Sequence, residues 1–229
     1  MRREKTSVSQ EDYLKAIWGL VQEEQVPISA RLAEDLGVTP PAVTAALRRM
    51  ANLGFLRVRP GGRIELLAKG KSAAEHLVLR HRLAEKLLTD VIGLEWSRAH
   101  EEAERLEHGI SPEVAGLLLK RFGRDSRCPH GVPLVGGMSR LRREFGAVRL
   151  SEAEVGRSYE ILRVYEKDPK FLEFLEGLSL RPAVSVRIHQ REYDETMEMS
   201  VLGDASERNG NRVHLGKPAT ERIWVRKTA

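Results

Sequence analysis

Four side chains that could bind a metal ion follow one another near the middle of the chain, namely His100, Glu104, Glu107 and His108. At about 100° per residue around a helix, all four fall on one stripe of a single helix face. Upstream, His81 and Glu85 are also one helical turn apart. Imidazoles and carboxylates at i, i+3 and i+4 spacing can converge on one ion, and both groups are common ligands of divalent metals. The set therefore predicts a metal site on the helices that carry it.

Each of these residues also has a simpler interpretation when it is taken alone. His81 and Glu85 would make an ordinary i, i+4 pair, and His130 would be a surface or packing residue. Asp12, far upstream, is explained as a first-turn acid that forms a capping box with Ser9. If Asp12 is a ligand instead, an ion held between it and the later acids would tie two parts of the chain together.

Positive and negative charge are concentrated in different segments. The chain of 229 residues holds 38 Lys and Arg against 33 Asp and Glu, a net charge of +5. Between Pro41 and Ser72, seven basic residues stand against one acid, Glu65, so this segment alone carries +6. Between His100 and His108, four glutamates stand against one arginine. A basic segment followed by an acidic, histidine-bearing one indicates two different ligands, a polyanion and a cation.

Composition excludes several classes of protein. Hydrophobic residues make up 41% of the chain and charged residues 31%, which is typical of a core-forming protein and not of a disordered one. No run approaches the roughly 18 consecutive apolar residues that cross a bilayer, and the basic N-terminus lacks the apolar segment of a secretory signal. A single cysteine, Cys128, excludes an internal disulfide and a multi-cysteine zinc site. We expect a cytoplasmic protein that does not bind a membrane.

The first 70 residues predict a winged helix-turn-helix. Apolar residues at helical spacing indicate helices over 9–24, 27–36 and 39–53. Gly37 stands where a left-handed helix end is expected. Two short apolar runs, 55–58 and 63–67, then flank an Arg-Pro-Gly-Gly turn and predict a β-hairpin. Helix, helix, turn, helix and hairpin is the order of this DNA-binding fold.

Candidate DNA-binding residues gather on the third helix and the hairpin. In a helix-turn-helix, the second helix of the motif presents its N-terminal residues to base edges in the major groove, here Thr39, Pro40, Pro41 and Thr44. Small, weakly polar side chains suit contact with thymine methyl groups, water-mediated contact and shape readout. Five arginines would meet phosphates, namely Arg48, Arg49, Arg57, Arg59 and Arg63. The simpler interpretation is that these arginines form only a solvated face.

The remaining chain predicts a helical domain followed by a small β domain. Helices are expected over 71–92, 97–108 and 111–121, then an irregular loop over 123–137 and an arginine-rich linker over 138–150. After Ser151, short β-like runs surround one helical run, which is typical of a small barrel of the SH3 type. The fold class is thus mainly α with a small β domain. The domains are expected at 1–70, 71–137 and 151–229.

Three segments carry a resemblance to a known family. They are HRLAEKLLTDVIGL (81–94), RAHEEAERLEHGIS (98–111) and CPHGVPLVGG (128–137). Together they resemble the metal-dependent repressors of the diphtheria toxin repressor (DtxR) family, which includes iron-dependent regulators and the manganese transport regulator. The resemblance covers the whole chain, and it implies a winged helix, a dimerisation and metal-binding domain and a C-terminal SH3-like domain.

The resemblance implies two metal sites. The primary site falls on Asp12, Glu104, Glu107 and His108. The ancillary site falls on His81, Glu85 and His100. The SH3-like domain of the family supplies two further ancillary ligands. Asp168 matches one of them, whereas Phe171 replaces the amide expected at the other.

The same resemblance places the chain nearest to the manganese-responsive branch. Iron-responsive members have methionine at the position of Asp12 and cysteine at that of Glu104. Carboxylates suit hard Mn²⁺, whereas thioether and thiolate favour softer ions. Lys15 stands where the manganese branch has a further acid, and an ammonium group cannot act as a ligand. A sensor of Fe²⁺ is the main alternative within the family, because imidazole and carboxylate also accept iron.

The sequence therefore predicts a manganese-responsive transcriptional regulator that represses metal-uptake genes. The bound ion would fix the separation of two recognition helices in a homodimer on double-stranded operator DNA. The dimer surface is expected on leucines of the helical domain, including Leu77, Leu83, Leu87, Leu117 and Leu118. A metal-dependent hydrolase is a distant alternative, and the chain has no HExxH motif, nucleophile elbow or Gly-rich phosphate loop. A DNA-binding protein that needs no metal is the third interpretation.

Overall fold

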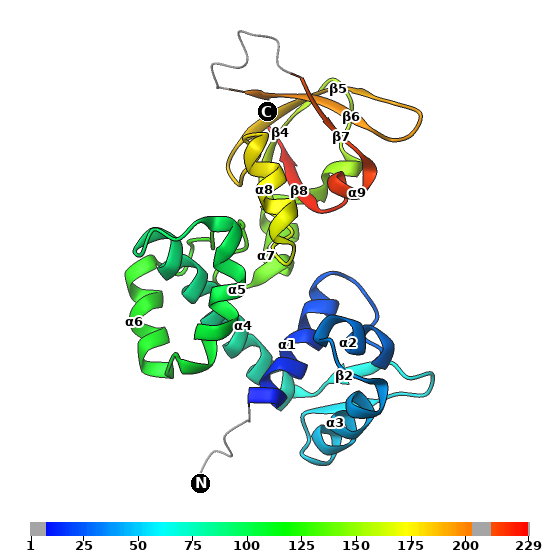
Figure 1. The fold of residues 1–229 in the computed structure, drawn as a ribbon, viewed down its shortest axis with the longest axis vertical. Coiled ribbons are helices and arrows are strands. Elements are labelled where there is room, and N and C mark those ends of the chain that lie inside the picture. The colour runs from blue at the N-terminus through cyan, green and yellow to red at the C-terminus, as the bar shows by residue number, and fades with distance from the viewer. Residues whose placement is uncertain (1–7, 203–211, 229) are drawn as a thin grey trace. The chain divides into compact units, whose positions relative to one another are not determined.

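The structure is a computed structural model that describes residues 8–202 and 212–228 of the chain. It divides into two compact units, which we call unit 1 and unit 2 (Figure 1). Unit 1 takes the chain up to His81 together with Glu107–Ser111, and unit 2 takes Arg82–Leu106 and everything from Pro112 onward. The chain thus leaves unit 1 at His81 and returns to it for one short segment at Glu107.

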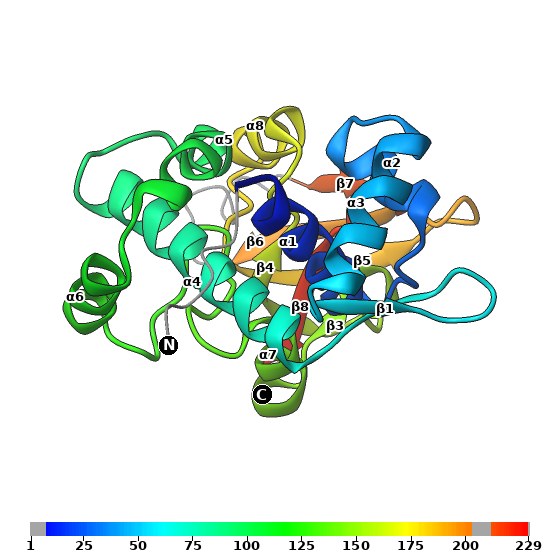
Figure 2. The same cartoon turned by 90° about the horizontal axis from the view of Figure 1, so that it is seen from below.

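Unit 1 is a winged helix-turn-helix, as the sequence predicts. Its helices and strands are α1 (Val8–Gln22), α2 (Ser29–Leu36), α3 (Pro40–Asn52), β1 (Leu56–Val58), β2 (Ile64–Leu66) and the first part of α4 (Ala68–Asp90). The 3₁₀ helix η1 (Glu107–Gly109) belongs to the same unit. The two strands pair antiparallel with Arg57 opposite Glu65, and their hairpin projects from the three helices (Figure 2).

Helical periodicity explains the core of unit 1. The apolar positions of α1, α2 and α3 are buried together, including Leu14, Ile17, Leu32, Leu47 and Met50. Gly37 ends α2 with a φ of 62°, a left-handed conformation that glycine adopts without steric cost.

The cap predicted at Ser9 differs from the structure, and the N-cap residue of α3 lacks a capping hydrogen bond. Ser9 is not an N-cap, because α1 already begins at Val8 and Ser9 has helical backbone in place of the extended conformation that a cap requires. Thr39 does take the N-cap position of α3, but its side chain makes no capping hydrogen bond. Two prolines in the first turn of α3 lack the backbone N–H groups that such a cap would satisfy.

Unit 2 begins with helices and closes with a sheet. Its helical part comprises the rest of α4, α5 (Trp96–Leu106), α6 (Pro112–Phe122) and α7 (Gly137–Phe145). The prediction of a linker over 138–150 is wrong, because α7 occupies its first half and β3 (Val148–Arg149) follows. Met138 and Leu141 are one turn apart and both fully buried, whereas Arg140 pairs with Asp125 and Glu144. The arginines therefore form the solvated side of an amphipathic helix.

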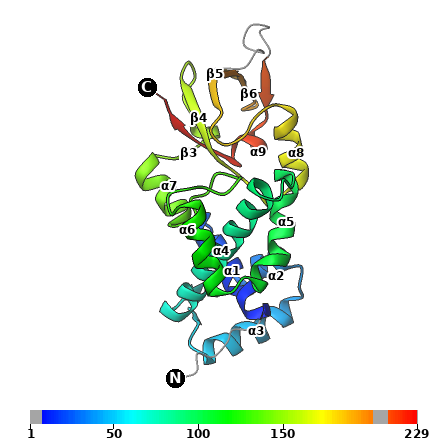
Figure 3. The same ribbon diagram turned by 90° about the vertical axis from the view of Figure 1, so that its left-hand side faces the viewer.

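The C-terminal part of unit 2 is a six-stranded antiparallel sheet in the order β3-β8-β4-β5-β6-β7. Figure 3 labels β3, β4, β5 and β6 of this sheet. The remaining strands are β4 (Ser158–Val164), β5 (Ser185–Arg191), β6 (Met197–Leu202), β7 (Val213–Leu215) and β8 (Ile223–Lys227). Helices α8 (Pro169–Gly177) and α9 (Lys217–Thr220) accompany them. Every second residue of β6 is buried, which is the pattern of a strand with one face on the core. This is the small β domain that the sequence predicts.

The helical part of unit 2 is anchored to the β domain by an aromatic side chain. Trp96, at the start of α5, packs in the same core cluster as Phe171 and Leu172 of α8. Its indole Nε1 donates to Glu176 Oε2 at 2.9 Å. The helical part of unit 2 and the SH3-like domain therefore belong to one compact unit, and the domain boundaries expected from the sequence stay a prediction. Among the described helices, none has the length and apolar character that crossing a membrane requires.

Gly70 allows a direct test of how closely α4 packs against Phe55 in unit 1. A Cβ on Gly70, in the first turn of α4, would lie 2.0 Å from the carbonyl oxygen of Phe55. We expect Gly70→Ala to lower the free energy of unfolding by about 1–3 kcal/mol, because the backbone must move to relieve the overlap. Chemical denaturation followed by circular dichroism measures this change.

Gly19 is the matched control, since it is also helical and a Cβ there meets nothing within 4 Å. Gly19→Ala should raise the stability by up to about 1 kcal/mol through helix propensity. Equal effects of the two substitutions would contradict the close approach of α4 to Phe55.

Candidate metal centres and DNA-binding surface

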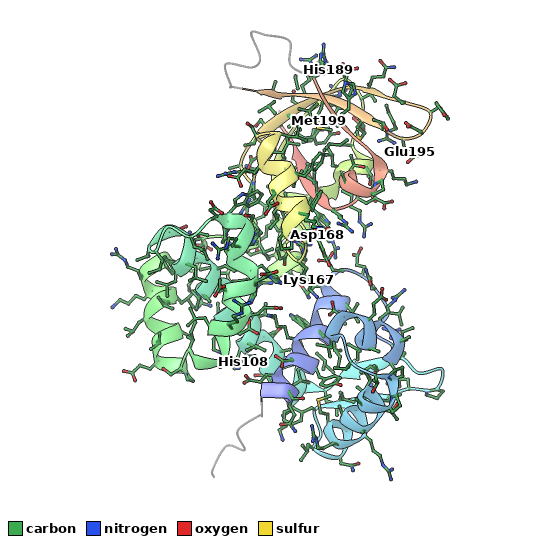
Figure 4. All side chains as sticks on the ribbon, viewed as in Figure 1. His108, Lys167, Asp168, His189, Glu195 and Met199 are labelled. Carbon is green, nitrogen blue, oxygen red and sulfur yellow. The ribbon has the colours of Figure 1, made fainter. Side chains whose placement is uncertain are left out.

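Unit 1 brings three of the predicted ligands together. Asp12 lies on α1, and Glu107 and His108 lie on η1, so segments about 95 residues apart in sequence meet. One ligand atom from each residue lies within 4.8 Å of the other two. His108 Nε2 is 3.0 Å from Asp12 Oδ1 and 3.7 Å from Glu107 Oε1. We call Asp12, Glu107 and His108 the unit 1 cluster; His108 is labelled in Figure 4.

A residue that sequence reasoning missed holds the imidazole of His108. Glu11 Oε2 lies 2.8 Å from His108 Nδ1, and because a carboxylate only accepts, Nδ1–H is the donor. Glu11 Oε1 in turn accepts from Arg80 Nη2 at 2.9 Å. The Nε2 atom is thereby turned toward Asp12 and Glu107. Carboxylates commonly orient metal-binding histidines in this way, so a carboxylate next to Asp12 was the available sequence signal.

Electrostatics make the unit 1 cluster unfavourable without a cation. Burial raises the pKa of Asp12, and the attraction of His108 offsets only part of that rise. Burial also acts to raise the pKa of Glu107, but hydrogen bonds and charge from His81 and Lys15 outweigh it, and the pKa is lowered. Glu107, only 1% exposed, thus remains a carboxylate because cationic groups surround it. A divalent ion supplies the same compensation, so the donor set fits a metal.

His81 takes part in unit 1 and not only in the ancillary group where the resemblance placed it. Its Nδ1 atom is 2.6 Å from Glu107 Oε2. Lys15, from α1, places its ammonium 2.8 and 3.0 Å from the two oxygens of Glu107 and 3.1 Å from His81 Nδ1. The structure therefore joins His81 directly to a predicted primary ligand.

Glu104, the fourth predicted primary ligand, belongs to unit 2. It lies on α5, and its half-exposed carboxylate is 3.6 Å from His100 Nε2. Within unit 2, then, Glu104 neighbours a residue of the predicted ancillary site, and its part in the primary site stays a prediction.

A second group of ligands is buried in unit 2. Glu85, Cys128 and His130 each offer an atom within 4.8 Å of the other two, and all three are less than 9% exposed. The same Glu85 Oε1 lies 3.1 Å from His130 Nδ1 and 3.3 Å from His100 Nδ1. We call Glu85, Cys128 and His130 the unit 2 cluster. It includes two residues that sequence reasoning left out, although cysteine and histidine two residues apart were a usable signal.

The hydrogen bonds of His130 leave one nitrogen available to an ion. His130 Nε2 is 3.0 Å from the carbonyl oxygen of Trp96, which only accepts, so Nε2–H must donate. The Nδ1 atom faces Glu85 without the geometry of a hydrogen bond. Burial lowers the pKa of His130, but the charge of Glu85 outweighs it and raises the pKa well above its usual value. The cationic imidazole that this shift favours directs its Nδ1 proton toward the buried Glu85, and a bound metal ion would take the place of that proton.

Burial raises the pKa of the Cys128 thiol, and the charge of Glu85 adds to the rise. A thiol with a raised pKa stays protonated near neutral pH, and a bound metal ion would deprotonate it. The donor set of the unit 2 cluster, with one sulfur, one nitrogen and one carboxylate, therefore fits a transition-metal ion better than Ca²⁺ or Mg²⁺.

Asp168 has a structural role in the described residues. Its Oδ1 accepts from Phe171 N at 3.1 Å as the N-cap of α8, and its Oδ2 lies 2.9 Å from Arg222 Nη1. Neither of the clusters defined above includes it, and Phe171 is buried in the core of the β domain. The predicted role of Asp168 as an ancillary ligand is thus not supported by its contacts (Figure 4).

The predicted DNA-binding side chains lie on the surface of unit 1. Those at the start of α3 are exposed, as are all five arginines, whereas Val43 and Leu47 of the same helix face the core. In the wing, Arg57 and Arg59 both donate through Nε to Glu65 Oε2, at 2.8 and 2.9 Å. These hydrogen bonds lower the pKa of Glu65. The wing therefore presents two arginines whose positions are fixed by one carboxylate.

The predicted dimer surface is only partly available. Leu77 and Leu83 are fully buried within the single chain, so their prediction as surface residues is wrong. Both leucines lie on sides of α4 that face a core, whereas Glu75 and His76 of the same helix are exposed. Leu117 on α6 is 62% exposed, and Val114 on the same helix is also exposed. An apolar surface on α6 agrees with the prediction for that helix.

Three family models match successive segments of the chain. "Iron dependent repressor, N-terminal DNA binding domain" matches residues 5–62, and "Iron dependent repressor, metal binding and dimerisation domain" matches 68–135. The FeoA domain matches 148–227. The three segments contain α1 to β1 of the winged helix, α4 to α6, and the six-stranded sheet.

Characterised relatives match over different lengths. The diphtheria toxin repressor of Corynebacterium efficiens is 33% identical over 182 residues, which cover 78% of this chain and 79% of that protein. The iron-dependent repressor IdeR of Mycobacterium leprae is 41% identical over 126 residues, which are 55% of each chain. The chain therefore spans about half the length of this second relative.

Solved structures match nearly the whole chain. A manganese-dependent transcriptional repressor in complex with manganese superposes with a TM-score of 0.84 at 28% identity, covering 96% of this chain and all of that one. IdeR of T. acidophilum gives a TM-score of 0.76, also at 28% identity, over 98% of this chain.

The charge next to the unit 2 cluster predicts how stability depends on pH. Burial acts to raise the pKa of Glu166, but Arg163, 2.9 Å away, and nearby histidines bring it from 4.5 down to about 2. A carboxylate with a lowered pKa stabilises the fold above pH 4.5, and this contribution is lost as the pH falls toward 2. We expect Glu166→Gln to be less stable than the wild type at pH 7, with a difference that shrinks in acid.

Guanidinium unfolding at pH 7, 4 and 3 measures this difference. Glu173→Gln, on the exposed side of α8, is the control and should leave the stability close to that of the wild type at every pH. A deficit of Glu166→Gln that stays constant from pH 7 to pH 3 would contradict the assignment.

Proposed function

Because the chain belongs to the diphtheria toxin repressor family, we propose that it is a transcriptional repressor that binds operator DNA when a divalent metal ion is bound. The observation that carries this proposal is the meeting of α1 with η1 at the unit 1 cluster. The first helix of a DNA-binding fold thereby contributes ligands to the same ion as a segment from the metal-binding region. The family is one of DNA-binding regulators and not of enzymes.

We propose Mn²⁺ as the ion of the unit 1 cluster. Two carboxylates and one imidazole form a hard donor set, and Glu104 would add a third carboxylate. The similarity to a manganese-dependent repressor in complex with manganese supports this ion. The iron-dependent relatives favour Fe²⁺ as the second candidate, because they share more sequence identity with the chain.

The chain's own residues prepare the unit 1 cluster for an ion. Arg80 fixes Glu11, Glu11 fixes His108, and the Nε2 atom of His108 then faces Asp12. Without a cation, burial destabilises the charged form of Asp12, which is why its pKa is raised. When bound, the ion supplies positive charge and bonds that hold α1 to η1. By linkage, the factor by which the ion raises the affinity for DNA equals the factor by which DNA raises the affinity for the ion. A coupling free energy of about 1–3 kcal/mol is usual.

We propose that the unit 2 cluster, with His100 beside it, holds a second ion. The ion would satisfy His130 Nδ1 and Glu85, and it would bind the thiolate of Cys128. The ancillary site expected on His81, Glu85 and His100 stays a prediction, and Asp168 is left out of the present proposal because its carboxylate caps α8. A cation in the unit 2 cluster would stabilise the turn from Cys128 to Gly131, in which Gly131 N donates to the Cys128 carbonyl oxygen and His130 Nε2 donates to that of Trp96 at the start of α5.

We propose that the protein binds DNA in the cytoplasm as a homodimer. Each copy would contact the duplex through α3 and the wing. Thr39, Pro40, Pro41 and Thr44 would face base edges, and the arginines would meet phosphates. Two copies would place recognition helices about 34 Å apart, or a multiple of it, along the duplex. The exposed apolar residues of α6 are the proposed surface of contact between the two copies.

His108→Ala tests the proposed function. The variant should bind operator DNA no better with Mn²⁺ than without it, because the ion loses its only nitrogen ligand in the unit 1 cluster. Asp12→Ala should behave in the same way. Fluorescence anisotropy with labelled operator DNA measures the affinity, titrated with Mn²⁺, Fe²⁺ and Zn²⁺ at one salt concentration, since salt alone shifts DNA affinity.

His76→Ala is the matched control, because this histidine is exposed on α4 in the same unit. Its response to Mn²⁺ should equal that of the wild type. A wild-type response in His108→Ala would refute the site, and operator binding by the wild type that a chelator leaves unchanged would favour a repressor that needs no metal. A stronger response to Fe²⁺ than to Mn²⁺ would assign the chain to iron.

A further inference from the structure

We propose that the ammonium group of Lys15 takes the place of a second divalent ion, so that unit 1 binds one ion and not two. The proposal rests on the proposed function, since it concerns the same cluster. Lys15 Nζ lies within 3.1 Å of three polar atoms, which are both oxygens of Glu107 and Nδ1 of His81. The three atoms come from α4 and η1 and converge on the end of a side chain from α1.

The atoms around Lys15 are of the types that bind metal ions. A carboxylate and an imidazole nitrogen are both common ligands of divalent cations. Glu107 is 1% exposed and His81 is 5% exposed, so water cannot readily replace the partner they share. His81 Nδ1 and Glu107 Oε2 are only 2.6 Å apart, a separation that requires a shared proton or an adjacent cation. Lys15 provides that cation as part of the chain.

Counting charges shows why one ion is enough. The side chains linked around His108 and His81 include three carboxylates, Glu11, Asp12 and Glu107, and two permanent cations, Lys15 and Arg80. Counted within unit 1 alone and with neutral histidines, their net charge is one negative unit. A single divalent ion changes this to one positive unit, and a second would leave three positive units among mostly buried side chains, which is strongly unfavourable. If Glu104 of unit 2 is also a ligand, each of these totals is lower by one unit, and the order of preference is the same.

Replacement of Lys15 by glutamate should allow a second divalent ion to bind. Lys15→Glu removes the ammonium and adds a carboxylate beside Glu107 and His81, so the net charge becomes three negative units. Two divalent ions would then again leave one positive unit, as one ion does in the wild type. The variant would also supply the oxygen ligand that a second ion needs between His81 and Glu107.

The experiment counts manganese ions bound to the full-length protein. Wild type and variants are equilibrated with Mn²⁺, separated from free metal and analysed by elemental mass spectrometry and protein assay. Lys15→Glu should bind one Mn²⁺ more per chain than the wild type. Two Mn²⁺ ions that share a carboxylate are magnetically coupled, so the six-line electron paramagnetic resonance signal per bound ion should also weaken in this variant.

Two control variants distinguish the effect of adding an oxygen ligand from the effect of changing the charge. Lys15→Met removes the ammonium without adding an oxygen, and it should bind the same number of ions as the wild type. Lys170→Glu makes the same change of charge at an exposed position of α8, and it should also leave the number unchanged. An extra ion in either control would overturn the proposal, as would a Lys15→Glu variant that binds no extra ion.

A second count of bound Mn²⁺ uses Asp12→Ala, which retains Lys15, so its result does not depend on how Lys15→Glu folds. Asp12→Ala should lower the number of Mn²⁺ ions per chain by one. A loss of two would overturn the proposal, because unit 1 would then hold a pair of ions beside Lys15. No loss at all would instead contradict the proposed function itself, since Asp12 would not be a ligand.

Discussion

The mutual repulsion of closely spaced carboxylates, one of them fully buried, is the constraint on which unit 1 depends. Glu11, Asp12 and Glu107 approach one imidazole ring, and two of them come from the first helix of the winged motif. Such a group is stable only with cations among its members. Lys15 and Arg80 supply two of these cations permanently, which leaves room for one exchangeable ion. We therefore propose that the DNA-binding fold contains a cation site among its own contacts.

The path of the chain explains how metal binding at this site could act on the DNA-binding helices. The chain leaves unit 1 within α4 at His81 and returns only for the segment that carries Glu107 and His108. An ion on the unit 1 cluster therefore binds the returning segment to α1, at the base of the helix-turn-helix. The unit 2 cluster uses a different donor set, with a thiol in place of one carboxylate. The two centres should accordingly differ in their preferred metals.

Much of this arrangement could be predicted from the sequence, and the rest could not, for identifiable reasons. Helical spacing and the Pro-Gly-Gly turn sufficed for the winged motif, and the family resemblance brought Asp12 together with His108. The linker at 138–150 was mispredicted because arginines conceal an amphipathic helix when only composition is considered. His130 and Cys128 lie in an aperiodic loop, where no local pattern shows which side chains turn inward. Lys15 was recognised as a residue that cannot bind metal, but its contacts depend on folding.

The location of manganese in a crystal of the full-length protein tests the central claim most directly. Anomalous diffraction on either side of the manganese absorption edge identifies the element at each bound position. The account predicts a manganese peak at bonding distance from Asp12, Glu107 and the Nε2 atom of His108, with the ammonium of Lys15 still against Glu107. A manganese-loaded crystal with no peak at these three residues would contradict it.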